Sequence, residues 1–405
     1  MRVVVFLAII LVLVGAGYTY VGWRVIGGSN LPVKWRRVGW AVLWMLFLLP
    51  VGMFTLQVSA DLGPSSTILV WPAYVALGWI SFVATLLLVR DGGWMVGRGV
   101  RHIMKTMGRY RDHTRLAPDR RRFLIKASNM GVLATATVLT GYGIARARRT
   151  PPIVTVEIPI RRLHPDLEGM TILQITDIHA GLTVDRSFVE DVVAQANTIV
   201  PDLVVVTGDL VDGSVPSLKD DVAPMGSLAG VYGRYFVTGN HEYYSGVEPW
   251  LEEIRRLGFT VLINQHMVLR RGGGSVVLAG VTDPTGGDFL PTHATSVARA
   301  LEGSPEADLR ILLAHQPKSI FEASRLGIDL QLSGHTHGGQ FVPWNFFAAM
   351  AQPYISGLHR HERTWIYVSK GAGYWGPPVR VGAASEISLL RLVHEPMEGR
   401  ASRKA

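Results

Sequence analysis

The sequence predicts an α/β domain preceded by a helical membrane region. Long apolar stretches fill much of the first 145 residues, whereas short β-rich runs alternate with amphipathic helical runs from residue 152 onward. The chain has 405 residues, is 48% hydrophobic and has positive mean hydropathy, which is too apolar for a purely soluble protein of this length. We therefore expect more than one domain, with part of the chain in lipid.

Four apolar stretches form the first region. The first three approach the ~20 residues that a helix needs to cross the hydrocarbon core, and the fourth is shorter. We expect three transmembrane spans within residues 1–90 and a fourth span or signal anchor within 127–149. The stretches are Val3–Val21, Trp40–Val58, Ile68–Val89 and Met130–Ala145.

Basic residues cluster between the third and fourth stretches, and they predict the orientation in the membrane. The net charge is +9, but many of the basic residues lie in 90–126 beside apolar segments, so the charge indicates topology and no nucleic-acid partner is expected. The loop at Asp61–Ser66 contains no basic residue. Loops rich in Lys and Arg stay in the cytoplasm. We expect a basic cytoplasmic segment at 91–126, with the C-terminal domain outside if the fourth stretch crosses and inside if it does not.

The end of that basic segment resembles a twin-arginine export signal. Paired arginines at Arg120–Arg121 precede Phe123–Leu124 and Lys126, and a mildly apolar run rich in Ala, Thr and Gly follows. The alternative is an ordinary basic membrane flank. The resemblance favours a crossing, with the twin-arginine export machinery as a partner and the domain outside the cytoplasm of a bacterial membrane.

The C-terminal region, residues 150–394, reads as the α/β domain, and 395–405 as a flexible polar tail. Gly272–Gly274 predicts a hairpin turn. Helices are expected at Ser187–Ile199, Glu248–Leu257, Thr295–Leu301 and Lys318–Leu326. Strands are expected at Ile153–Ile158, Thr171–Thr176, Leu203–Thr207, Tyr235–Thr238, Val276–Gly280, Ile311–Ala314, Leu330–Ser333, Trp365–Val368 and Ile387–Leu390.

Acids, an amide and imidazoles follow five of these predicted strands, where open α/β sheets place their ligand sites. Asp177/His179 and His335/His337 are each separated by one residue, which on an extended chain points both side chains the same way. Because the chain has no cysteine, a metal must be held by oxygen and nitrogen ligands. The candidate ligands are Asp177, His179, Asp209, Asn240, His315, His335 and His337.

Seven ligands exceed what one tetrahedral ion takes, so two divalent ions sharing a carboxylate are expected, with Asp209 as the bridge. Two ions roughly 3.5–4 Å apart can activate a shared water as hydroxide and clamp phosphoryl oxygens. The pattern therefore predicts hydrolysis of a phosphate ester. The ligand set accommodates Mn, Zn or Fe, and the sequence does not distinguish among them.

The succession D-x-H, G-D, G-N-H-E, H and G-H-x-H resembles the calcineurin-like metallophosphoesterase superfamily over residues 165–390. The resemblance implies a four-layer αββα sandwich. It gives one metal Asp177, His179, Asp209 and His337, and the other Asp209, Asn240, His315 and His335. His241 would be a catalytic residue that donates to the phosphate or protonates the leaving group. The G-H-T-H-G-G-Q form is similar to a membrane-associated bacterial branch, some of whose members are exported by the twin-arginine route or act on lipid-linked phosphodiesters or UDP-diacylglucosamine-type pyrophosphates.

Other polar and aromatic residues near the motifs receive simpler interpretations. We expect Asp212 and Asp283 to cap loops, and Glu242 to do no more than orient its neighbour. Tyr374, Trp375 and Trp344 either contact an apolar substrate or the bilayer or pack in the core. His266, His293, His359 and His361 stay unassigned, although the last two are candidates for the rim of the site.

The expected function is therefore that of a multi-pass membrane phosphoesterase acting on a phosphodiester, pyrophosphate or monoester. A short tether between the last apolar run and the first strand favours a lipid-linked substrate and contact with membrane lipids. The alternative is a membrane scaffold or sensor that uses the fold as a binding module. A transporter is disfavoured because the spans contain no interior acid or base resembling a relay.

Overall fold

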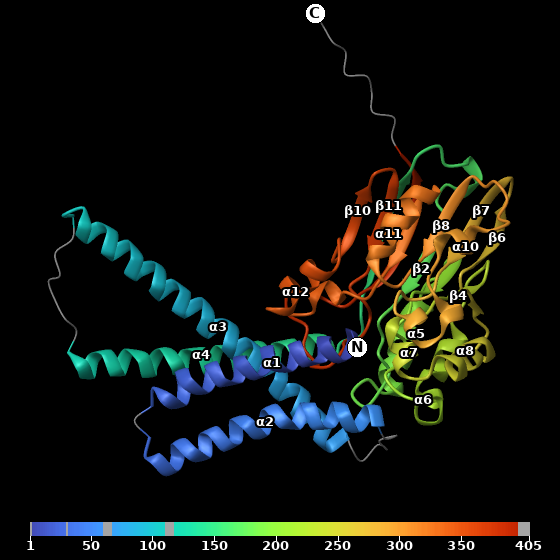
Figure 1. Ribbon diagram of the computed structural model, residues 1–405. Helices are drawn as coiled ribbons and strands as arrows, with labels where there is room; N and C mark the ends of the chain where they lie inside the picture. The colour runs from blue at the N-terminus through green and yellow to red at the C-terminus, as the bar shows by residue number, and fades with distance from the viewer. Residues whose placement is uncertain (1, 30, 60–66, 110–116, 396–405) are drawn as a thin grey trace, which may run out of the picture. The chain divides into compact units, whose positions relative to one another are not determined.

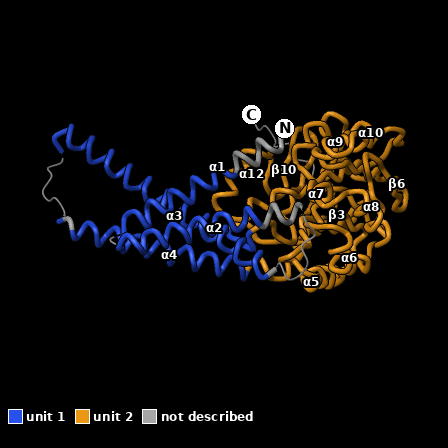
Figure 2. Tube along the Cα trace, turned by 60° about the horizontal axis from the view of Figure 1, so that its bottom comes forward, with its two compact units in different colours: residues 1–59, 66–145, 377–381 blue, residues 60–65, 146–376, 382–405 orange. Residues whose placement is uncertain are grey.

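The computed structural model describes residues 2–29, 31–59, 67–109 and 117–395 (Figure 1). The chain divides into two compact units (Figure 2). The first, which we call the helical unit, comprises residues 1–59, 66–145 and 377–381. The second, the sandwich domain, comprises residues 60–65, 146–376 and 382–405. The loop at Asp61–Ser66, Arg111, Arg115 and the tail beyond residue 395 lie outside the described residues.

The helical unit contains the four apolar stretches of the sequence. In the part of the chain that the structure describes, two helices are long and apolar enough to cross a membrane, over Ile68–Thr106 and Asp119–Ala147. The side chains of residues 2–10 and 53–59, in the first two predicted spans, are not described. The helices are α1 (Arg2–Gly22), followed by a π-turn (Trp23–Gly27), α2 (Val33–Ser59), α3 (Thr67–Thr106) and α4 (Pro118–Ala147).

Two of these helices extend well beyond the predicted apolar stretches. The third stretch ends at Val89, but α3 continues through the basic residues to Thr106, and α4 begins twelve residues before Met130. Lys and Arg are good helix formers and neither extension contains an interior proline, so a change from apolar to basic composition does not end a helix.

Asp91 of α3 joins three elements of the helical unit through polar contacts. Its Oδ2 accepts from the Tyr20 hydroxyl at 2.6 Å and from Arg24 Nε at 2.5 Å, and its Oδ1 accepts from Arg90 Nε at 3.2 Å. Arg90 Nη1 in turn donates to Asn129 Oδ1 of α4 at 2.5 Å. Polar groups near the ends of the apolar stretches therefore connect α1, α3 and α4.

A segment that is remote in sequence, Pro377–Val381, also belongs to the helical unit. A Cβ at Gly78 of α3 or at Gly143 of α4 would press on Val379, and Arg380 N donates to the Gly143 carbonyl at 3.0 Å. The absence of side chains at these two positions lets the segment lie against both helices.

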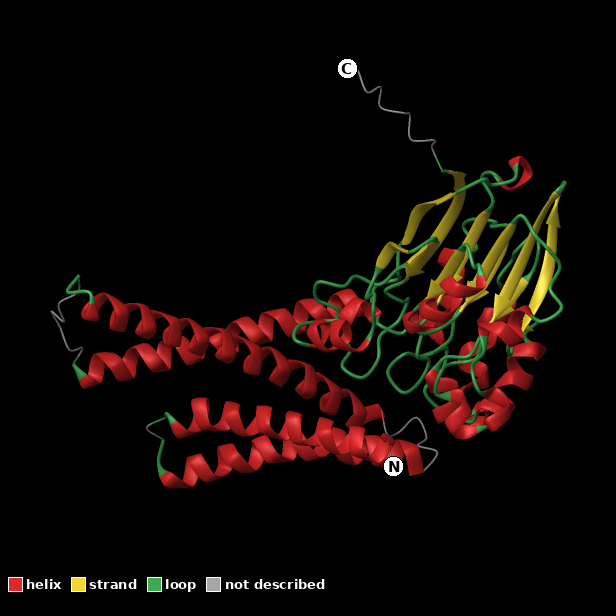
Figure 3. Cartoon of the chain, turned by 45° about the horizontal axis from the view of Figure 1, so that its top comes forward, coloured by secondary structure: helices red, strands yellow, loops and turns green. Residues whose placement is uncertain are grey.

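Within the described residues, the sandwich domain is built from two mixed six-stranded sheets (Figure 3). The first has the order β1-β12-β2-β3-β4-β5 and the second β10-β11-β9-β8-β7-β6. The α/β class with two mixed sheets is confirmed. The strands are β1 (Ile153–Ile160), β2 (Thr171–Ile175), β3 (Leu203–Val206), β4 (Arg234–Phe236), β5 (Thr260–Val261), β6 (Gln265–Arg271), β7 (Gly274–Gly280), β8 (Leu309–Leu313), β9 (Leu330–Ser333), β10 (Gly357–His361), β11 (Thr364–Val368) and β12 (Ile387–His394).

Alternation along the strands places apolar side chains on both faces of each sheet. Leu203 and Val205 of β3 point into a core shared with Ile311 and Leu313 of β8, between the sheets. Leu173, Ile175, Val204 and Val206 face a second core under α5, α6 and α8, and Ala279 and Leu312 face a third under α10 and α11. The helices are α5 (Arg186–Ala196), α6 (Val215–Val222), α7 (Asn240–Tyr244), α8 (Val247–Arg256), α9 (Gly286–Phe289), α10 (Val297–Leu301), α11 (Ile320–Ala323) and α12 (Trp344–Ala351).

Several predicted boundaries differ from the structure. The expected helix at Lys318–Leu326 is broken into 3₁₀ turns around the four-residue α11. Predicted strands at 171–176, 203–207 and 235–238 end one or two residues early, because the chain turns there to deliver the polar motif residues. The prediction did not include β5, β6, β10, α6, α7, α9 or α12.

Candidate metal centre

The seven predicted ligands all lie just beyond strand ends of the two sheets or at the start of a short helix. Asp177 and His179 follow β2, Asp209 follows β3, His315 follows β8, and Asn240 begins α7. Backbones with positive φ are uncommon for residues with a Cβ and concentrate at functional sites. Five of the ligands have one: Asp177 (55°), His179 (54°), Asp209 (52°), His335 (71°) and His337 (50°).

The left-handed residues change the expected orientation of the paired ligands. The pairs separated by one residue are not extended, so an alternation of side chains along a strand is not what orients them. Asp177 and His179 still reach one cluster, but His335 and His337 point into two different clusters. The turns after the strands, rather than the strands themselves, set the directions of the side chains.

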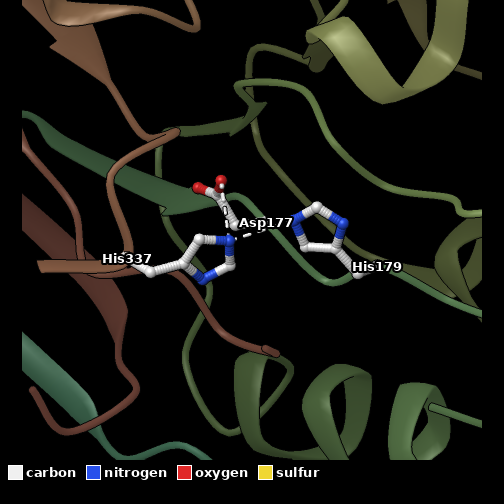
Figure 4. A group of neighbouring side chains, drawn as sticks. All are labelled: Asp177, His179 and His337. Atoms are coloured by element: carbon white, nitrogen blue, oxygen red, sulfur yellow. Dashed lines mark hydrogen bonds and ion pairs between the residues drawn. The ribbon is translucent and has the colours of Figure 1, made fainter. Parts of the chain in front are cut away.

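The first cluster contains Asp177, His179 and His337 (Figure 4). The Nε2 atoms of His179 and His337 face each other at 3.0 Å, and His337 Nε2 lies 3.6 Å from Asp177 Oδ1. All three side chains are buried. Zinc–nitrogen bonds of about 2.0–2.1 Å put two nitrogens on one ion roughly 3 Å apart, which matches this arrangement.

The second cluster contains Asp209, His315 and His335. His315 Nε2 lies 3.0 Å from Asp209 Oδ2 and 3.1 Å from His335 Nδ1. The same Asp209 Oδ2 is 3.7 Å from His179 Nε2 of the first cluster. One carboxylate oxygen thus lies between the two clusters, in the position of a bridging ligand.

The side chain of Asn240, the residue before His241, provides an independent observation that favours a bound metal. Its Oδ1 is buried and has no hydrogen-bond partner among the described residues, although a buried polar atom of this kind normally has one. An amide oxygen without a donor fits a bound cation. The residues present therefore fit two divalent ions: Asp177, His179 and His337 form one cluster, His315 and His335 lie in the other, and Asp209 lies between them. Asn240 is the further oxygen ligand that the family resemblance gives to the second ion.

Backbone donors fix the carboxylates of this centre. His335 N donates to both oxygens of Asp177, at 2.9 and 3.0 Å, and His241 N donates to Asp209 Oδ1 at 2.9 Å. The carbonyl of Thr207, 2.8 Å from His315 Nδ1, accepts from that ring, which leaves Nε2 directed at Asp209. Contacts of this kind select the ring tautomer and orientation that a ligand needs.

Asp212 occupies a position that the sequence interpretation missed. Its Oδ1 lies 3.0 Å from His179 Nδ1 and 2.6 Å from His241 Nδ1, and the three form a third group of possible ligand atoms. Asp212 is not a simple loop cap, because it joins a candidate ligand to the candidate acid. Its place three residues after Asp209, in G-D-x-x-D, is the sequence signal that was available.

Glu242 also has a larger role than expected. The side chain is fully buried and accepts from the backbone N–H groups of Asp209 at 3.0 Å, Leu210 at 2.7 Å and Gly239 at 2.6 Å. Burial and then the charge of Asp209 raise the pKa of Glu242 to about 7. This carboxyl group fastens together the two loops that carry Asp209 and Asn240.

The histidines of this centre differ strongly in pKa. Burial opposes the charging of His315, but Asp209 outweighs it and raises the pKa to about 10. Burial opposes the charging of His241 too, and Asp212 and Asp209 raise its pKa to about 9. Burial and the nearby His315 lower the pKa of His335 to about 3. Burial would raise the pKa of Asp209, but His315 and His241 hold it well below its ordinary value.

The remaining predicted candidates lie outside the two clusters. Asp283 caps a loop as expected, accepting from Thr285 N at 2.8 Å. Tyr374 is buried, and its hydroxyl donates to a carbonyl, whereas Trp375 is half exposed with its ring 5.6 Å from that of His241. The unassigned histidines contact other groups: His266 the Ala300 carbonyl, His293 the Tyr243 hydroxyl, and His359 and His361 the ring of Tyr354.

Comparison with known proteins gives a consistent family. The family model described as calcineurin-like phosphoesterase matches residues 170–339. A Bos taurus protein described as a transmembrane protein with metallophosphoesterase domain is 36% identical over 343 residues, covering 80% of this chain and 74% of its own. A Helicobacter pylori protein described as an uncharacterized metallophosphoesterase is 33% identical, covering 87% and 90%. A solved 5'-nucleotidase precursor from Thermus thermophilus superposes with a TM-score of 0.35 at 16% identity, covering 55% of this chain and 54% of its own.

Proposed function

Because the chain belongs to the calcineurin-like phosphoesterases and is a metallophosphoesterase, we propose that it is a membrane-anchored enzyme that hydrolyses phosphate esters at two divalent ions held by the seven ligands. The observation that carries the proposal is the position of Asp209 Oδ2 between the two clusters, 3.0 Å from His315 and 3.7 Å from His179. The ions, when bound, supply Lewis acidity toward phosphoryl oxygens and an activated water.

The side chains around the ions have separable roles in this proposal. His241 holds the proton that the leaving oxygen needs, and the carboxylate of Asp212 beside its Nδ1 raises the pKa of the ring and so favours the protonated form. Asp212, 2.6 Å from Nδ1, orients the ring so that Nε2 is the nitrogen that donates to the substrate. The two loops tied by Glu242 keep Asp209 and Asn240 in fixed relation.

We further propose a multi-pass anchor with the sandwich domain outside the cytoplasm. Relatives named as transmembrane proteins and the two apolar helices indicate membrane association. The span at Asp119–Ala147 lies in a helix whose first turn carries the paired arginines, so a crossing puts Arg120 and Arg121 on the cytoplasmic side and Ala147 on the other. A C-terminal fusion tests this: alkaline phosphatase is expected to be active and green fluorescent protein dark, and the reverse pattern would overturn the topology.

The catalytic proposal is tested on the full chain purified in detergent. With Mn²⁺, Fe²⁺ or Zn²⁺, it is expected to hydrolyse bis-p-nitrophenyl phosphate. Asp209→Ala should lose both metal and activity, whereas His241→Ala should keep its metal and lose about 10²–10⁴-fold in rate. Equal activity in all three proteins would sink the assignment, and a metal-free, inactive native chain would favour the scaffold or sensor alternative.

A further inference from the structure

Helix α12 (Trp344–Ala351) has an uncharged and largely apolar exposed surface. Its sequence, WNFFAAMA, contains no charged residue, and none of its side chains is buried. The exposed fractions are 64% for Phe346, 47% for Phe347 and 84% for Met350. Soluble proteins rarely leave neighbouring large apolar side chains uncovered, and such patches mark membrane or protein contacts.

The first turn of α12 is fixed to the loop that carries His337. Gly339 has φ +77°, and a Cβ there would collide with the backbone of Asn345, so the helix lies directly against the motif loop. Next to it, Gln340 Nε2 donates to the Trp375 carbonyl at 3.1 Å, and Trp375 N donates back to Gln340 Oε1 at 3.0 Å. The start of α12 thus lies close to the metal centre.

The other end of α12 is fixed to the loop that carries His315. The buried Gln352 donates through Nε2 to Gln316 Oε1 at 3.1 Å, and its own Oε1 accepts from Lys318 N at 3.2 Å. The start of the helix therefore packs against Gly339, two residues from His337, and the residue after its end bonds to Gln316, one residue from His315. Because the helix is held at both ends and still exposes phenylalanine and methionine, we expect this face to contact another apolar surface.

The connections of the sandwich domain to the candidate membrane helices indicate that this apolar surface is the bilayer. Only residues 148–152 separate the end of the candidate span α4 at Ala147 from β1, a reach of about 17 Å at ~3.4 Å per residue. A second connection leaves from the site itself: Trp375 is two residues before Pro377, where the chain enters the helical unit. Because Trp375 is bonded to Gln340, four residues before α12, this second connection begins on the loop that precedes the helix.

We propose that α12 is an interfacial helix that inserts Phe346, Phe347 and Met350 into the surface of the bilayer that anchors the chain. An apolar helix face of this type lies about 5–10 Å into the boundary between headgroups and acyl chains. Resting on the proposed function, the inference also names a substrate class. With α12 at the rim of the metal centre, the ester that reaches the metals is carried by a membrane lipid headgroup.

The absence of cysteine makes a direct test straightforward. Met350→Cys in the full chain is labelled with a fluorophore and reconstituted in phosphatidylcholine vesicles with or without tail-brominated phosphatidylcholine. We expect quenching at residue 350 and none at the control Val200→Cys, which is 73% exposed elsewhere on the sandwich domain. Equal quenching at the two sites would overturn the proposal. A blue-shifted label that bromine does not quench would also overturn it, because the helical unit or a second copy would then cover α12.

A second experiment tests the substrate class. Phe346→Gln/Phe347→Gln/Met350→Gln is expected to lower the ratio of activity on a vesicle-borne lipid phosphate ester to activity on bis-p-nitrophenyl phosphate by about tenfold. Val200→Gln/Val231→Gln, which alters exposed apolar residues away from α12, should leave that ratio unchanged. An unchanged ratio in the α12 variant would contradict the lipid substrate. Failure of the native chain on both esters would refute the proposed function alone, since quenching needs no activity.

Discussion

Asp209 of the sandwich domain and Asp91 of the helical unit are both acids enclosed by basic groups, but their surroundings differ in what they leave unsatisfied. Both oxygens of Asp91 accept from donors of the chain: Tyr20 and Arg24 on Oδ2, and Arg90 on Oδ1. Around Asp209, by contrast, imidazole nitrogens face each other at 3.0 and 3.1 Å, and the buried Asn240 Oδ1 has no partner among the described residues.

This difference separates a structural cluster from a binding centre. Two guanidinium groups balance the charge of Asp91 and a hydroxyl donates to it, so donors of the chain satisfy the carboxylate. The Asp209 centre also keeps five residues with left-handed backbones, and strain of this kind persists only where the surroundings hold it and function uses it. An added cation would complete the Asp209 centre and would have no place at Asp91.

Removal of metal is the change that should separate the two regions most. Chelation of the purified chain is expected to abolish hydrolysis, by at least about a thousandfold, because Lewis acid stabilisation is worth several kcal/mol. The sandwich domain should also lose about 4 kcal/mol of stability per site relative to metal at a thousandfold excess over Kd. Calorimetry with and without chelator would show this. A shift of the helical unit instead of the sandwich domain would contradict the comparison.

Asp212→Asn should have the next largest effect. The variant loses the carboxylate that faces both His179 Nδ1 and His241 Nδ1, and loss of such supporting contacts costs about 10–100-fold in metal affinity or rate. It should also lower the pKa of His241, because Asp212 is the main group raising it, and the alkaline limb of the rate profile should move to lower pH. Asp308→Asn, which removes a carboxylate that caps a loop through Ser275, is the control. Identical pH profiles in the native chain and Asp212→Asn would exclude the positioning role.

Metal binding should be linked to protons at the Asp209 centre. In the metal-free chain the pKa of His315 is raised to about 10, so the ring is charged at neutral pH and must lose its proton to become a ligand. Between about pH 7 and 9, each unit of pH should strengthen binding about tenfold, and the dependence should flatten as pH rises through about 10. Titration calorimetry in buffers of different ionisation enthalpy measures the proton released. A pH-independent affinity over this window would show that His315 is neutral.

The sequence was sufficient for some features of the site because their signal is local. Five motifs in order gave the six residues that the structure gathers into the two clusters, and β-rich runs gave most strands of the sandwich. The features that the sequence did not predict depend on contacts between residues that are far apart in the chain. Asp212 was interpreted as a loop residue because its two histidine partners are 33 and 29 residues away in sequence. The role of Glu242 was missed because its carboxyl group bonds to a loop that is remote in sequence. The family resemblance gave the split of His335 and His337 between clusters, whereas their spacing did not, because the split follows from the backbone angles of the two residues.

Asp91→Asn should have the smallest effect on catalysis and the clearest effect on the helical unit. The substitution removes the negative charge shared by Arg24 and Arg90 while keeping the size of the side chain, and hydrogen bonds to charged groups contribute about 1.5–3 kcal/mol each. The helices α1, α3 and α4 should separate at lower temperature in detergent, while hydrolysis of bis-p-nitrophenyl phosphate at 25 °C stays within about twofold, since no metal ligand is touched. Asn129→Ala removes the acceptor for Arg90 on α4 and the donor to the Arg24 carbonyl but leaves the charge of Asp91, and it should lower the melting temperature by less. If Asp91→Asn instead abolished metal binding, the two polar clusters would be one coupled system.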